Sequence, residues 1–181
     1  MAHHQQQQFF LRIKQQFPDK FIGCDVLDIG SLDINGNNRY LFEDYNYIGV
    51  DVGEGPNVDV VSKGHEYKSE KLFDVVISSE CFEHDMYYEE TIKNCILLTK
   101  PKGLFTFTCA STGRAEHGTR RTDGSWAAPL LALHDNDWSD YYKNLTESDI
   151  RQFINPDELF SEYYFEYEPS MCDLYFWGIK K

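Results

Sequence analysis

The chain has 181 residues, of which 41% are apolar and 15% aromatic, and a chain of this size buries roughly 70% of its unfolded surface in one core. Its 17 Lys and Arg against 30 Asp and Glu give a net charge of −13, which repels phosphates and excludes bulk nucleic-acid binding. No run of 18 apolar residues and no basic leader with an apolar core is present, so we expect no membrane association and a single soluble, cytoplasmic domain over residues 1–181.

The N-terminal residues 1–20 are expected to form a tail or helix ahead of the main fold. A glutamine run at residues 5–8 leads into Phe10, Ile13 and Phe17, whose spacing predicts one apolar helix face. Five apolar runs then predict buried strands over residues 24–30, 47–51, 58–61, 73–79 and 103–110.

Helices are predicted between these strands. A short one is expected over residues 37–43, and a longer one over 87–99 is ended by Pro101 and Gly103. The alternation of strands and helices predicts an α/β fold with a parallel sheet.

The C-terminal part adds one helix and two strands. Thr146 with Asp149 forms a pattern similar to a capping box and predicts a helix start at "ESDIRQFI". Aromatic-rich runs at 163–167 and 173–179 predict an antiparallel hairpin at the sheet edge. The expected fold is therefore a Rossmann-like three-layer sandwich, with a mostly parallel seven-stranded sheet that ends in this hairpin.

Residues 110–145 form the one long segment without clear periodicity. Segments of this length inside a domain are usually functional or disordered, and a solvated linker rarely carries as many large rings as Trp126, Trp138, Tyr141 and Tyr142. We expect this segment to be a substrate lid.

The five cysteines are odd in number and never spaced as C-x-x-C. Most of them lie within apolar runs, which predicts buried free thiols at Cys24, Cys81, Cys95, Cys109 and Cys172.

The stretch "VLDIGSLDINGN", residues 26–37, ends an apolar strand with an acid and a glycine, as a parallel strand does when its carboxyl end opens onto a ligand crevice. A dinucleotide-binding G-x-G-x-x-G pattern would need glycines where Leu32 and Asn35 stand, so close approach of the backbone to a pyrophosphate is poorly supported. Asp51 ends the next strand, 21 residues after Gly30, where a carboxylate can accept hydrogen bonds from both ribose hydroxyls. NAD and S-adenosylmethionine both offer that ribose, and the loop favours the second.

The segments "VLDIGS", "GVD", "FDVVISSECFEH" and "LLTKPKGLFTFT" occur in this order. Together they resemble the motif set of class I S-adenosylmethionine-dependent methyltransferases of the small ubiquinone-methylase-like type (methyltransferase domain 11), over residues 24–108. The tract from residue 112 to 150 also resembles a subgroup of bacterial and phage methyltransferase-like proteins.

The resemblance implies S-adenosyl-L-methionine as cofactor and a role for individual residues. Asp28, Gly30 and Ser31 would face its methionyl part, Asp51 its ribose and Val52 its adenine, while Ser79 and Glu80 would lie beside the transferring methyl group and the substrate. Two departures stand out: "SLDING" replaces the later glycines of the loop, and Lys63 or its neighbour replaces an acid near adenine. Adenine recognition would then rest on the backbone around Gly64 and His65.

A dense polar cluster follows the fourth strand at Glu80, Glu83, His84 and Asp85, so a general base or a metal site has to be considered. His84 is one candidate for a catalytic base, and His117 is the other. The family resemblance places a Glu-His pair here in many relatives with different substrates, which favours a structural hydrogen bond instead. A metal site including His117, His134, Asp135 and Asp137 lacks tight ligand spacing, and none is expected.

Substrate-binding candidates come from the lid segment. Arg114, Arg120 and Arg121 reverse the charge locally and either receive an anionic group or pair with the many surface acids. Tyr141 and Tyr142 either cover the crevice or pack on the sheet.

The sequence thus predicts an S-adenosylmethionine-dependent methyltransferase that transfers a methyl group by in-line displacement to a small, anionic or sugar-like acceptor, on oxygen or nitrogen. A non-catalytic cofactor-binding or interaction module on the same fold is the main alternative, and a nicotinamide-dependent oxidoreductase is disfavoured by the loop. The acceptor, the need for a base and the oligomeric state stay open.

Overall fold

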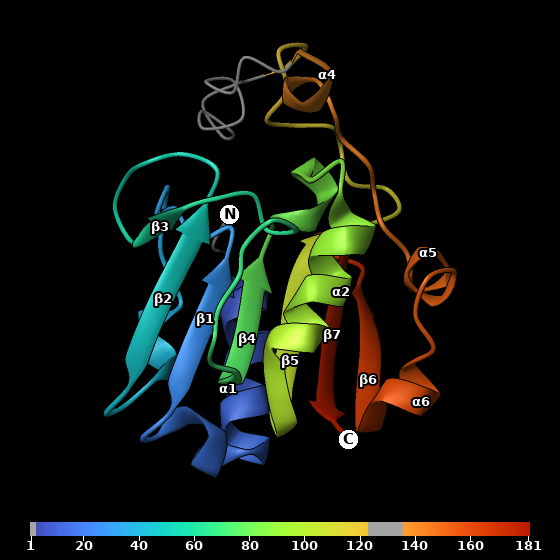
Figure 1. Ribbon diagram of the computed structural model, residues 1–181. Helices are drawn as coiled ribbons and strands as arrows, with labels where there is room; N and C mark the ends of the chain where they lie inside the picture. The colour runs from blue at the N-terminus through green and yellow to red at the C-terminus, as the bar shows by residue number, and fades with distance from the viewer. Residues whose placement is uncertain (1–2, 123–135) are drawn as a thin grey trace.

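The computed structural model describes residues 3–122 and 136–181. Seven strands form one sheet in the order β3-β2-β1-β4-β5-β7-β6 (Figure 1). The strands are β1 (Asp25–Ile29), β2 (Asn46–Asp51), β3 (Val60–Val61), β4 (Phe73–Ser79), β5 (Thr99–Ala110), β6 (Phe160–Glu168) and β7 (Asp173–Lys180). β1 to β5 pair in parallel and β7 pairs antiparallel with both β5 and β6. The predicted seven-stranded Rossmann-like sheet with its C-terminal hairpin is confirmed.

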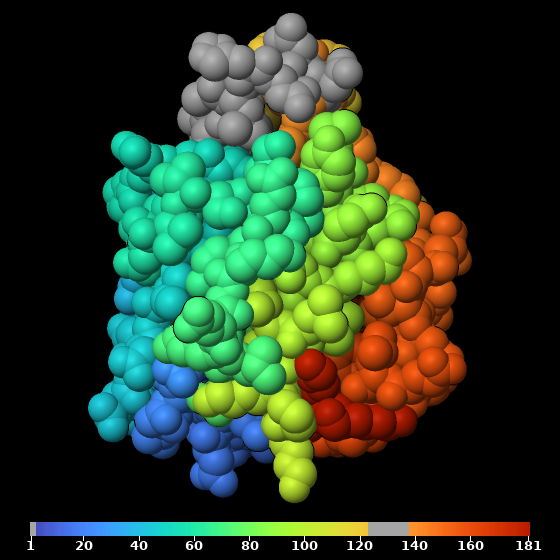
Figure 2. Space-filling model, in the orientation of Figure 1, coloured from blue at the N-terminus to red at the C-terminus, as the bar shows by residue number. Residues whose placement is uncertain are grey.

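The sheet separates two apolar cores. On the face turned away in Figure 1, α1 (His4–Gln16) buries Phe9, Phe10 and Ile13 against β1, β4, β5 and β7. On the near face, α2 (Tyr88–Leu98) and residues after β3 cover the strands, as Figure 2 shows. Burial on both faces explains why β1 and β4 read as continuous apolar runs rather than as alternating ones.

The carboxyl ends of the parallel strands are joined by segments from both ends of the chain. β7 runs antiparallel, so its start at Asp173 lies beside Ala110 at the carboxyl end of β5. The N-terminal end of α1 reaches the same edge (Figure 1), where the His3 Nε2 lies 2.8 Å from the Asp173 carboxylate. Segments from both ends of the chain therefore meet at the carboxyl ends of the parallel strands.

The predicted helix over 37–43 is wrong. One 3-10 turn, η2 (Arg39–Leu41), stands there, and the side chains of the two asparagines before it form hydrogen bonds. Asn37 accepts from the Arg39 backbone N–H at 3.0 Å, while Asn38 donates to Asp28 and Ser79. Such side-chain bonds compete with helical backbone hydrogen bonds, and the connection from β1 to β2, which the structure describes in full, holds no α-helix.

Shorter helical elements complete the chain. They are η1 (Pro18–Phe21), η3 (Phe82–His84), α4 (Asn136–Ser139), α5 (Glu147–Arg151) and α6 (Pro156–Leu159). The predicted cap of α5 is confirmed, because the Thr146 hydroxyl accepts from the Asp149 N–H and the Asp149 carboxylate accepts from the Thr146 N–H. His3 and Gln6 form the equivalent capping box on α1, so the glutamine run begins a helix.

The cysteine prediction holds in part. All five thiols are free, and Cys24, Cys95 and Cys109 are buried. Cys81 and Cys172 are only half-buried, because each lies at the carboxyl edge of the sheet rather than inside it.

Part of the expected lid, residues 123–135 with Trp126, His134 and Asp135, lies outside the described residues. Among the helices that are described, none has the length and apolar character needed to cross a membrane.

Candidate cofactor cleft

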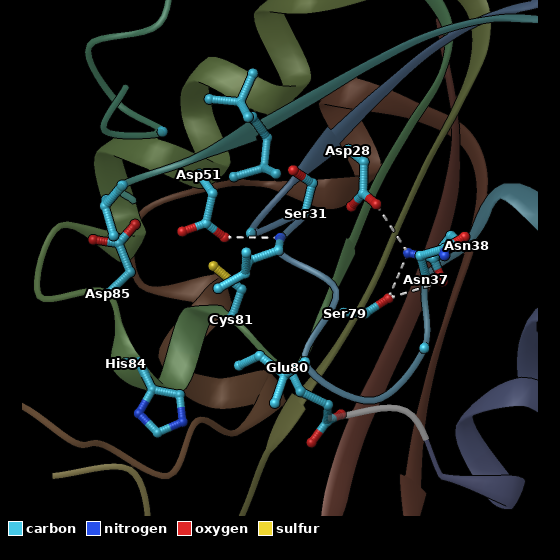
Figure 3. A pocket seen from close by; sticks show the side chains of 18 of the residues that line it. Asp28, Ser31, Asn37, Asn38, Asp51, Ser79, Glu80, Cys81, His84 and Asp85 are labelled. Carbon is cyan, nitrogen blue, oxygen red and sulfur yellow. Dashed lines mark hydrogen bonds between the residues drawn. The ribbon is translucent and has the colours of Figure 1, made fainter. Parts of the chain in front are cut away.

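A cleft with an empty volume of about 1070 Å³, open mouth included, lies at the carboxyl ends of β1, β2 and β4. Figure 3 shows its polar side chains converging from these strand ends and from η3. Nine of the residues predicted from the sequence line it: Asp28, Gly30, Ser31, Asp51, Val52, Ser79, Glu80, His84 and His117. This is the switch-point position at which open α/β sheets bind ligands.

Asp51 ends β2 and is held by the loop after β1. One carboxylate oxygen accepts from the Leu32 N–H at 3.0 Å (Figure 3), and the other accepts from the Gly53 N–H at 3.3 Å. Burial raises the pKa of Asp51, and these backbone hydrogen bonds oppose the rise. The carboxylate is therefore oriented before any ligand binds.

Asp28 lies in β1, two residues before the loop, and is only 2% exposed. One of its oxygens accepts from the Tyr47 hydroxyl and from the Asn38 amide at 3.3 Å, while the other has no partner among the described residues. Burial raises the pKa of Asp28 to about 7, against these two hydrogen bonds. A buried oxygen without a partner in a cleft is a ready acceptor for a ligand's donor.

Gly30, at the start of the loop after β1, stands where no side chain can be accommodated. Gly30 has a positive φ of 77°, and a Cβ there would lie 2.5 Å from the Cys81 side chain, so no larger residue fits. The adjacent Ser31 is buried and its hydroxyl has no partner among the described residues.

The part of the cleft at Val52, where the sequence resemblance predicts adenine, is lined by Trp138 and by Gly64. Trp138 packs with Val52, and its indole N–H donates to the His84 carbonyl at 2.9 Å. Gly64 also lines the cleft, and its carbonyl accepts from Asn94 at 2.8 Å. His65 is not part of the lining; its ring stacks 4.4 Å from that of Tyr87, centroid to centroid.

Ser79 and Glu80 mark the end of β4. The Ser79 hydroxyl accepts from Asn38 at 2.9 Å, which joins this strand end to Asp28 (Figure 3). Glu80 has a left-handed backbone with φ of 50°, unusual for a residue with a side chain. Its carboxylate is 7% exposed and neither oxygen has a partner among the described residues. Burial raises the pKa of Glu80.

The two histidines predicted as bases lie together. The His84 and His117 rings are 4.9 Å apart between centroids, and Tyr142 packs within 5.4 Å and 5.1 Å of them. Burial lowers the pKa of His84 to about 3 and lowers that of His117 as well. Burial also raises the pKa of the neighbouring Glu83 to about 8, with the Glu80 carboxylate adding to the rise. The expected structural bond between Glu83 and His84 is not formed, because both Glu83 oxygens and His84 Nδ1 have no partner among the described residues.

Of the substrate candidates that the structure describes, the arginines and tyrosines lie outside the cleft lining. Arg114 donates to the Met171 carbonyl at 2.7 Å and pairs with Asp173 at 3.3 Å. Arg121 pairs with Glu116 and donates to the Asp140 carbonyl. The Arg120 backbone N–H donates to Asp140. Tyr141 packs against both the near-face core and Trp138.

Sequence reasoning missed Gln6 and Asn38. Both are buried in the cleft lining, Gln6 from the N-terminal helix and Asn38 from the β1–β2 connection. The only signal for Gln6 was its helical spacing, since it lies one turn before Phe10 on the apolar face of α1.

No family model matches the sequence, and no curated protein matches it. Solved structures match its fold. The 1,6-didemethyltoxoflavin-N1-methyltransferase of Burkholderia thailandensis, with bound 1,6-didemethyltoxoflavin and S-adenosylhomocysteine, has a TM-score of 0.59 and 16% identity over 100% of this chain and 92% of that one. The N-methyltransferase NodS from Bradyrhizobium japonicum WM9 has a TM-score of 0.58 and 12% identity over 97% and 96%.

This chain has the class I methyltransferase fold. Haemonchus contortus phosphoethanolamine N-methyltransferase 2, in complex with phosphomonomethylethanolamine and S-adenosylhomocysteine, has a TM-score of 0.62 and 15% identity over 96% of this chain and 52% of that chain. The resemblance seen in the sequence motifs is thus confirmed for the class I methyltransferase fold.

Proposed function

We propose that this protein is an S-adenosylmethionine-dependent methyltransferase acting on a small molecule. The observation that carries the proposal is the pair of acids at the ends of adjacent strands, Asp28 and Asp51, which line one cleft together with the unpartnered Ser31 hydroxyl. These groups suit a ligand with an ammonium at one end and a ribose diol beside it.

The residues fit the cofactor part by part. Asp51 would accept hydrogen bonds from the two ribose hydroxyls, and its backbone partners Leu32 and Gly53 keep both oxygens turned to the cleft. The free oxygen of Asp28 and the hydroxyl of Ser31 would bind the ammonium and carboxylate of the methionyl part. Trp138 and Val52 supply an apolar wall for adenine.

When bound, the cofactor would supply an activated sulfonium methyl group for transfer to the acceptor. The chain's work is then orientation and exclusion of water, which in favourable cases is worth roughly 7–11 kcal/mol. The acceptor end is the part of the cleft formed by Glu80, His84 and His117. Burial lowers the pKa of both imidazoles, and more strongly at the buried His84 than at the half-buried His117, so the unprotonated ring nitrogens are available to accept a hydrogen bond or to bind a cation.

Thermal unfolding with and without S-adenosylhomocysteine tests the proposal, with NAD as the control ligand. At a concentration about 100 times Kd a ligand adds roughly 2.7 kcal/mol of stability, equivalent to about 5–10 °C for a domain of this size. We expect S-adenosylhomocysteine alone to raise the unfolding temperature. An equal shift by NAD, or no shift by S-adenosylhomocysteine, would reject the cofactor assignment and favour a binding module without this chemistry.

A further inference from the structure

Three side chains of types that can bind metals, Glu83, His84 and His117, lie close together beside the cleft, and the two histidines line it. Glu83 and His84 belong to η3, and His117 comes from the segment after β5. One donor atom of each lies within 4.8 Å of the other two. His84 and His117 both line the cleft, so an ion held between these residues would face its interior.

Two of the three side chains, Glu83 and His84, have buried donor atoms without partners among the described residues. Glu83 is fully buried at 0% exposed, yet neither of its carboxylate oxygens has a hydrogen-bond partner among the described residues. The same holds for Nδ1 of His84, whose side chain is 8% exposed. Leaving buried polar groups unsatisfied is costly, and an unplaced ion is one of the few features that accounts for several such atoms in one place.

A second layer of contacts orients the outer ligand. Nδ1 of His117 lies 3.1 Å from the Ala115 carbonyl oxygen, which can only accept, so Nδ1 carries the hydrogen and Nε2 keeps its lone pair. The Tyr142 hydroxyl donates to the same carbonyl at 3.2 Å, and its ring packs on both histidines. Metal-binding histidines are usually fixed in this way by a bond from the second ring nitrogen.

We propose that Glu83, His84 and His117 form a binding site for a divalent first-row metal ion such as Zn²⁺. Two imidazoles and one carboxylate are a ligand set that such ions accept, and three protein ligands leave open coordination positions. Ligand atoms of a tetrahedral site lie roughly 3.4 Å apart at bond lengths of about 2.0–2.2 Å, so rotation of the side chains is needed to close the site from its present separation.

The open positions face the acceptor end, which gives the ion a role in selecting the acceptor. An acceptor oxygen bound to the ion would be oriented and made more acidic, as metal-bound water and hydroxyls are. This part rests on the proposed function and assigns a hydroxyl-bearing acceptor. The binding site itself does not depend on it.

A second group of possible ligands, His3, Glu80 and Asp173, lies nearby. There the Asp173 carboxylate already pairs with His3 at 2.8 Å and with Arg114 at 3.3 Å. Because the Asp173 carboxylate is already occupied by these two side chains, this group links the two chain ends and is not proposed as a metal site.

The test is metal binding by the full-length protein after chelator treatment, without any acceptor. Titration with Co²⁺, followed by calorimetry and by visible absorption, should give about one equivalent. His117→Ala should weaken binding about 100-fold, since even the loss of an outer-layer partner costs 10–100-fold. Glu83→Gln, nearly identical in shape, should weaken it similarly, while the matched control His4→Gln, exposed on α1, should bind as the unaltered chain does.

The outcomes separate the two proposals. Unchanged Co²⁺ affinity in both site variants, or loss on His3→Gln instead, would overturn the metal site even if S-adenosylhomocysteine still stabilises the protein. Saturable Co²⁺ binding that both site variants weaken would support it, even if S-adenosylhomocysteine fails to bind and the proposed function falls. Unfolding temperatures of the variants without metal check that each is folded.

Discussion

The two halves of the cleft differ in how far their polar groups are satisfied. In the proposed cofactor half, which holds Asp28, Ser31 and Asp51, both oxygens of Asp51 accept from backbone N–H groups and one oxygen of Asp28 accepts from the Tyr47 and Asn38 side chains. At the proposed acceptor half, neither the oxygens of Glu80 in the lining nor those of the fully buried Glu83 have a partner among the described residues. The acids of the first half are oriented by the chain itself, whereas the carboxyl groups at the second need partners from a ligand or an ion.

The origin of the residues explains this difference. Asp28, Ser31 and Asp51 lie within one β-loop-β unit, so local backbone N–H groups are at hand. Glu83 and His84 sit on a 3-10 turn covered by the segment after β5, and Trp138 and Tyr142 come from beyond residue 135. Packing of these distant segments buries Glu80 and Glu83 but brings no hydrogen-bond donor to their carboxyl groups among the described residues.

Asp51→Ala should have the largest effect, a loss of affinity for S-adenosylhomocysteine. It tests the proposed cofactor half of the cleft. Two charge-assisted hydrogen bonds to the ribose would be lost, each worth about 1.5–3 kcal/mol, so S-adenosylhomocysteine affinity should fall by roughly 100-fold or more. Calorimetric titration measures it. Asp19→Ala, an exposed acid in η1, is the matched control and should leave affinity unchanged. Equal affinities in both variants would refute the ribose assignment.

Arg114→Ala should have the next largest effect, on stability. It tests whether this arginine of the expected lid stabilises the fold rather than binds a substrate. It removes the hydrogen bond to Met171 and the ion pair with fully buried Asp173, so we expect a loss of about 2 kcal/mol in unfolding free energy and a fall of about 4–8 °C in unfolding temperature. S-adenosylhomocysteine affinity should not change.

The control for that change is Arg12→Ala. Arg12 also holds the C-terminal hairpin, through Glu166 at 2.8 Å, but its side chain is 54% exposed, and an exposed pair contributes less than about 1 kcal/mol. A stable Arg114→Ala variant with a raised acceptor KM would instead restore the substrate-binding role.

A third expected effect is a pH dependence carried by Asp28. Its pKa is raised by burial to about 7 from an ordinary value of 3.8, so the neutral form stabilises the ligand-free fold. That contribution is full below about pH 4 and is lost as the pH rises through 7. Binding an ammonium needs the ionised form, so S-adenosylhomocysteine affinity should rise up to about tenfold per pH unit below 7.

Asp28→Asn supplies the comparison, because it keeps the shape and cannot ionise. Unfolding by denaturant and calorimetric titration at about pH 5.5, 6.5 and 7.5 should show flatter profiles for both stability and affinity. Identical profiles with and without the substitution would assign the pH dependence to another group.

The strands could be predicted because a strand buried on both faces must be apolar along its length, whatever packs on it. The same reasoning found the acids at the strand ends, since Asp28 and Asp51 follow directly from where each apolar run stops. The prediction of a helix near residue 37 was wrong because the Asn37 side chain accepts from the Arg39 N–H and the Asn38 side chain donates to Ser79. The periodicity of apolar residues gives no information about such hydrogen bonds.

The sequence by itself determined the strands and the acids Asp28 and Asp51 at their ends, because those depend on residues close together in the chain. Only the tertiary structure decided the acceptor half. It brings His117, 33 residues beyond His84, against the ring of that residue, and it carries Gln6 from the first helix into the cleft wall. Contacts between segments so far apart depend on how the elements pack on both faces of the sheet, so the spacing of residues along the chain does not predict them.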